Sequence, residues 1–81
     1  MTLQEILTRY QKLVNESKLD PDMPAFMLIG QDCCAARTVQ YWAELAYIAG
    51  SPEDYVNSAR DSASEMGRWP VKRVPGSPVT K

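Results

Sequence analysis

Basic and aromatic side chains between residues 37 and 73 are the parts of this sequence best suited to bind a ligand. Arginine and lysine hold phosphate, and tyrosine and tryptophan stack on nucleobases or on guanidinium groups. The same residue types are also enriched at protein interfaces, so a nucleotide site and a protein interface both stay open. Together with a polar pair that precedes a predicted helix, the candidate ligand-binding residues are Gln31, Asp32, Arg37, Tyr41, Tyr55, Arg60, Trp69, Lys72 and Arg73.

Within this set, we assign phosphate contact to the basic residues Arg37, Arg60, Lys72 and Arg73, and base stacking to Tyr41, Tyr55 or Trp69. The polar pair has two interpretations. Backbone amides at a helix start favour anions, so Gln31 and Asp32 could contact a ligand or partner at a rigid corner. The interpretation we favour is structural: Asp32 caps the helix, and Gln31 satisfies nearby backbone groups.

Catalytic and metal-ligating residues are scarce. The chain has no histidine, which removes the commonest general base and a common metal ligand. Cys33 and Cys34 are adjacent, and this spacing matches neither a zinc motif nor an unstrained disulfide, because neighbouring α-carbons lie only about 3.8 Å apart. Cys33 stands at a predicted helix start, which favours a thiolate, but no base is available to activate it. We therefore expect no enzyme, no metal and no cofactor, and two cysteines buried as small apolar residues.

Charge separates along the chain. The formal net charge is −1, all ten acidic residues precede Arg68, and the four basic residues from there on are Arg68, Lys72, Arg73 and Lys81. The balance argues against a nucleic-acid-binding protein. The basic tail fits either an acidic partner, such as a phosphate group or the acidic body of a second subunit, or an ordinary solvated tail. With no secretory signal and no apolar run long enough to span a bilayer, we expect a cytoplasmic protein without membrane contact.

The elements that must position these residues are three helices. Apolar residues at helical spacing and capping signals predict helices over residues 3–17, 33–49 and 52–68, with Asp32 and Ser51 as N-caps and Gly50 as a stop. Prolines make residues 70–81 an extended C-terminal arm. We expect a compact all-α three-helix domain that spans residues 1–81, in which Trp42 lies in the core.

Residues 24–30 are the ambiguous segment. Five consecutive apolar residues, Ala25 to Ile29, precede Gly30, and periodicity alone cannot separate a strand from a helix here. A strand would need a partner, and no second strand-like run is visible, so it would have to pair with another subunit. We slightly favour an extended apolar plug that lies across the helices.

A series of residues covers positions 24 to 75: Phe26, Leu28, Gln31-Asp32, Val39, Trp42-Ala43, Met66 and Trp69-Pro70. This pattern resembles a family of small uncharacterised proteins encoded by phages and prophages. No activity is assigned to that family, so the resemblance implies a biological context and no catalytic residue. The adjacent cysteines and the first predicted helix lie outside the pattern.

That context implies a non-enzymatic protein of the host cytoplasm that counters host defence by binding. One hypothesis is an oligomeric sponge that sequesters a nucleotide immune signal, such as a cyclic nucleotide, between subunits. The alternative is a protein that binds a host protein directly and inhibits it. A chain of 81 residues builds a small core, which itself favours a homo-oligomer.

Overall fold

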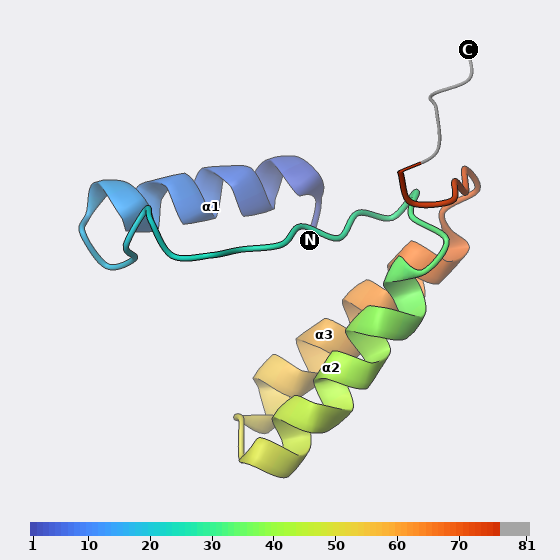
Figure 1. The fold of residues 1–81 in the computed structure, drawn as a ribbon. Coiled ribbons are helices and arrows are strands. Elements are labelled where there is room, and N and C mark those ends of the chain that lie inside the picture. Colours follow the sequence, from blue (N-terminus) through green and yellow to red (C-terminus); the bar gives the residue numbers. More distant parts are fainter. Residues whose placement is uncertain (77–81) are drawn as a thin grey trace.

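The computed structural model describes residues 1–76, and within them the chain forms three helices and no strand. The helices are α1 (Leu3–Asn15), α2 (Ala35–Ala49) and α3 (Glu53–Arg68). Figure 1 shows α2 and α3 side by side as a hairpin, with α1 on the other side of an extended linker. The predicted all-α class is confirmed. Of the predicted arm over residues 70–81, positions 77–81 lie outside the described residues.

A capping box starts α1. The Thr2 hydroxyl accepts a hydrogen bond from the Glu5 amide, and the Glu5 carboxylate accepts one from the Thr2 amide. These bonds favour the charged form and lower the pKa of Glu5. The helix ends at Asn15, two residues before the predicted end, because the backbone turns left-handed at Ser17 with a φ of 59°.

The start of α2 differs from the prediction. Its N-cap is Cys34 and its first helical residue is Ala35, whereas the sequence suggested Asp32 as the cap of a helix from residue 33. The reason is a turn ahead of the helix, in which the Asp32 carboxylate accepts a hydrogen bond from the Cys34 amide at 2.7 Å. At the other end Gly50 stops the helix, as predicted, with a left-handed φ of 92°.

The hairpin closes with a short link between α2 and α3. Pro52 is the N-cap of α3, and its carbonyl accepts the Val56 amide, so the predicted cap at Ser51 is wrong by one residue. The acidic Glu53 and Asp54 occupy the first turn, where the helix dipole favours negative charge. The helix ends at Arg68, immediately before the Trp69-Pro70 pair.

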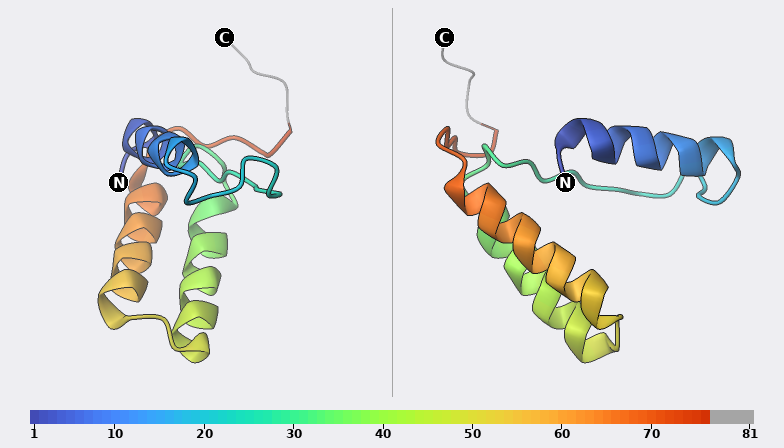
Figure 2. Two further views of the ribbon diagram at one scale, coloured as in Figure 1. Left: turned by 90° about the vertical axis from the view of Figure 1, so that its left-hand side faces the viewer. Right: turned by 180° about the vertical axis from the view of Figure 1, so that it is seen from behind.

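Small residues form the core between α2 and α3. The buried apolar residues are Ala35, Ala43, Ala46, Val56 and Ala63, of which Val56 is the largest fully buried one. The small alanine side chains allow α2 and α3 to pack against each other, and Figure 2 shows these two helices side by side. Trp42, predicted as core, is instead 46% exposed at the edge of this contact. The hairpin therefore buries little of the apolar surface that the chain carries.

The first helix does not cover that hairpin. The α-carbons of α1 stay more than 8 Å from those of α2 and α3, and the right-hand view in Figure 2 shows α1 leading away from the end of the hairpin where α2 begins. An ion pair of 3.6 Å between the Met1 amino group and Glu65 ties its start to α3.

The linker between α1 and α2 is extended but is not a plug. Residues 24–29 form neither helix nor strand, and Phe26 is 87% exposed. Leu28 and Ile29, nearer to the hairpin, are partly buried. The expectation of an apolar plug across the helices is therefore wrong for its first half, because the helices that it was to cover lie apart. Within residues 1–76, no helix combines the length and the apolar character needed to cross a bilayer.

Candidate functional site

A shallow groove between α2 and α3 contains two of the predicted binding residues. Arg37 and Tyr41 stand one helical turn apart on α2, on the same side of the groove. The groove has a volume of about 490 Å³, and its residues are Ala36, Arg37, Gln40, Tyr41 and Glu44 from α2 and Ala63 and Gly67 from α3. The α3 side is hollow because alanine and glycine contribute almost no side chain there.

Gln40 and Glu44 also line this groove, and neither was among the residues predicted from the sequence. Both follow the same i, i+3, i+4, i+7 spacing from Arg37 that places residues on one helix face, so the spacing was the signal. Among residues 1–76, no ion pair or side-chain hydrogen bond engages Arg37. Its guanidinium is therefore available to an anion.

Arg60, a predicted phosphate ligand, is occupied within the hairpin. Its guanidinium donates to Glu44 from two nitrogens, at 3.0 and 3.2 Å, and a third nitrogen donates to Asn57. It also lies 5.8 Å from the centre of the Tyr47 ring, within the range of a cation–π contact. This arrangement ties α3 to α2 and neutralises Glu44 beside the groove.

Tyr55, a predicted stacking residue, packs on a second aromatic ring instead. Its ring meets Trp42 edge to face, with centroids 5.9 Å apart. Tyr55 lies in the first turn of α3, whereas the groove lies toward the end of that helix, so the structure does not bring Tyr55 and Arg37 together.

The remaining predicted residues meet at the corner where the linker enters α2. Arg73 pairs there in a parallel bridge with Asp32: its amide donates to the Gln31 carbonyl at 2.7 Å, and its carbonyl accepts from the Cys33 amide. The Lys72 ammonium donates to the carbonyls of Gly30 and Met66. These bonds hold the C-terminal arm against the end of the hairpin, which is a structural role for Gln31, Asp32 and Lys72.

Trp69 belongs to the same corner. A Cβ atom on Gly30 would lie 3.5 Å from the Trp69 side chain, so the indole packs against the linker backbone. It still leaves 55% of its surface exposed. Trp69 therefore anchors the linker and offers its remaining surface to another molecule.

The two cysteines lie beside this corner and are exposed, which corrects the expectation that they are buried. Their sulfur atoms are 3.9 Å apart, and the hydrogen bond with Cys33 raises the pKa of the Cys34 thiol. With one Asp32 oxygen they form a group of three metal-ligating atoms within 4.8 Å of one another.

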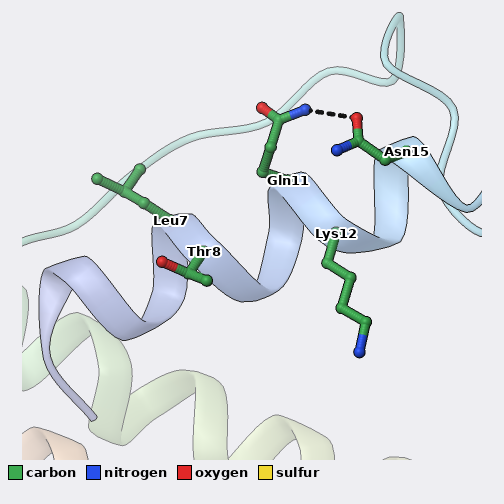
Figure 3. Close-up of a pocket in the computed structure, with 5 residues that line it drawn as sticks. All are labelled: Leu7, Thr8, Gln11, Lys12 and Asn15. Atoms are coloured by element: carbon green, nitrogen blue, oxygen red, sulfur yellow. Dashed lines mark hydrogen bonds between the residues drawn. The ribbon is translucent and has the colours of Figure 1, made fainter.

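A second hollow lies along α1 alone. Its residues are Leu7, Thr8, Gln11, Lys12 and Asn15, and its volume is about 590 Å³. Figure 3 shows Leu7 and Lys12 pointing to different sides of the helix, while Gln11 donates to Asn15 at 2.9 Å. Since one helix lines it, this hollow is an open surface rather than an enclosed site.

Comparison with known proteins returns no matching family model, no matching curated protein and no matching solved structure.

Proposed function

We propose that this chain is a phage-type, non-enzymatic binding protein that counters host defence as a homo-oligomer in the host cytoplasm and sequesters a nucleotide signal. The observation that carries the proposal is the pairing of Arg37 with Tyr41 along one open groove. A guanidinium without a protein partner suits a phosphate, and a phenol ring one turn away suits a base.

A second copy is part of this proposal because one groove is incomplete. It is open along one side and has a single unengaged cation, since Arg60 is bound to Glu44. Small-molecule sites usually bury most of their ligand. Two copies would supply a second arginine and a second ring, which is the arrangement a nucleotide with two phosphates requires.

Calorimetric titration with a panel of cyclic mono- and dinucleotides tests the proposal. We expect heat with at least one member, and at least tenfold weaker binding for Arg37→Ala and Tyr41→Ala. Arg9→Ala, which removes the same charge from α1, is the matched control and should bind normally. A panel that gives no heat with the unaltered chain contradicts nucleotide sequestration.

Direct inhibition of a host protein is the second candidate function. The exposed tyrosine and tryptophan side chains on the hairpin favour it, because Tyr and Trp are enriched among the residues that dominate protein interfaces. This candidate predicts no heat with the nucleotide panel, together with a host protein that the unaltered chain captures. The Ile48→Asp variant, which carries a charge on the exposed face, should no longer capture that host protein. The Thr8→Asp variant, altered on α1, should still capture it.

A further inference from the structure

The apolar face of α1 is only partly covered: Leu3, Leu7 and Tyr10 are exposed, and Ile6, Leu13 and Val14 are half-buried. No residue of α1 is buried, although its apolar residues form one stripe at helical spacing. A single helix of 13 residues is marginally stable in water, so α1 needs a surface to pack on. The stripe consists of Leu3, Ile6, Leu7, Tyr10, Leu13 and Val14.

A second apolar stripe, exposed at each of its three positions, runs along α2. Tyr41, Leu45 and Ile48 follow i, i+4, i+7 spacing and are 67%, 47% and 79% exposed. The residues of α2 that are buried, such as Ala43 and Ala46, lie on a different side of the helix, toward α3. Thus α2 has one apolar face for its own hairpin and another without a partner among the described residues.

The two stripes match in size. A helix rises about 1.5 Å per residue, so α1 with 13 residues and α2 with 15 are about 20 and 22 Å long. Within one chain they do not meet, because α1 leads away from the hairpin and stays more than 8 Å from it. A second copy can bring an α1 to each α2.

We propose that two copies exchange their first helices, so that the α1 stripe of each packs on the Tyr41–Leu45–Ile48 stripe of the other. The inference rests on the assembly proposed above and names its contact surface. In such a pair Tyr41 lies at the border between the helix contact and the groove, so the incoming α1 would close the open side of the binding site.

The exposed area supports a second copy as the occupant. The chain exposes 6781 Å², whereas a folded monomer of its mass exposes about 4,900 Å². The excess of about 1,900 Å² per chain is more than twice the 800 Å² or so that each partner contributes to a standard interface. A formal net charge of −1 leaves little repulsion between copies.

Disulfide trapping tests the exchange. In a Cys33→Ser, Cys34→Ser background, Leu7→Cys and Ile48→Cys are combined in one chain and oxidised. Exchange predicts a covalent product of twice the 9.1 kDa chain mass on a denaturing, non-reducing gel. A link within one chain, which runs at the single-chain mass, shows that α1 folds back on its own hairpin and overturns the proposal. Thr8→Cys in place of Leu7→Cys, on the polar side of α1, should link far less.

Charge substitutions provide a second readout that needs no cysteine. Leu7→Asp and Ile48→Asp should each reduce the mass in solution to that of one chain, and Thr8→Asp should not. Both sites are exposed in the single chain, so the hairpin should retain its helical signal. An unchanged mass in both variants contradicts the exchange. Neither readout depends on nucleotide binding, so the exchange can fail while the proposed sequestration holds, and the reverse.

Discussion

Arg37 and Arg60 have the same charge but contact different surroundings. Arg60 is tied to Glu44 and to the Tyr47 ring, while Arg37 faces the groove. The Arg60–Glu44 pair is partly exposed, with 38% and 50% of the side chains accessible, so its contribution to stability is that of a surface pair. Arg60 thus has a structural role, whereas Arg37 is available for a ligand.

This division predicts the effect of Arg60→Ala. Loss of the pair between α2 and α3 should lower the free energy of unfolding by about 0.5–1 kcal/mol. Urea titration at equal protein concentration measures the change, and Arg37→Ala is the control that should unfold like the unaltered chain. Equal destabilisation by both substitutions would show that another group of the protein also engages Arg37, which would then not be free for a ligand.

The cysteine pair predicts a pH dependence. The hydrogen bond with Cys33 is the main cause of the raised pKa of Cys34, so the Cys34 thiol holds its proton to higher pH and reacts slowly. Cys33→Ala removes that bond, and the pH profile of Cys34 alkylation should shift to lower pH, with faster reaction at neutral pH. Iodoacetamide labelling followed by mass spectrometry measures the rate. An unchanged profile would contradict the coupling between the two thiols.

Only part of the candidate site could be predicted from the sequence. Arg37 and Tyr41 were found from residue type, and the helical spacing around them also contains Gln40 and Glu44. The roles of Arg60 and Lys72 could not be found, because their partners lie 16 and 42 residues away, at Glu44 and Gly30. Residue type identifies a cation, but only the fold shows whether another group already engages it.

At the scale of elements, local chemistry predicted the helices well. The capping box at Thr2 and Glu5, the stop at Gly50 and the break at Trp69-Pro70 each act over a few residues and can be recognised in sequence. The start of α2 lies two residues after the predicted one, because a turn engages the Asp32 carboxylate, and the start of α3 lies one residue later than predicted. The separation of α1 from the hairpin depends on long-range packing, which helical periodicity does not specify.

Substitution by alanine should change the stability in opposite directions at two glycines. Gly50 has a φ of 92°, so Gly50→Ala should cost about 1 kcal/mol through backbone strain alone, since a Cβ there meets no atom within 4 Å. Gly67 lies inside α3, and its Cβ would meet Ala36 at an ordinary 3.9 Å, so Gly67→Ala should stabilise by about 0.5–1 kcal/mol. Thermal unfolding of the two variants checks the signs. If both variants shifted the unfolding temperature in the same direction, backbone conformation would not determine the change in stability at one of the two glycines.

At the scale of the whole molecule, a single chain leaves most of its large apolar side chains exposed. Small residues alone are buried among the described residues, while Phe26, Trp42 and Ile48 are exposed. The radius of gyration is 14.1 Å, against about 12 Å for a typical domain of this length. The short length predicts a small core, and the structure leaves these large apolar side chains exposed. The assembly that we propose would cover them.

The mass of the protein in solution tests this central claim most directly. Light scattering on the chromatographically separated protein at micromolar concentration should give an integral multiple of the 9.1 kDa chain mass, with two chains as the smallest assembly. The exchange of α1 predicts an even number of chains. A single species of 9.1 kDa under these conditions would contradict the assembly, the shared nucleotide site and the helix exchange together.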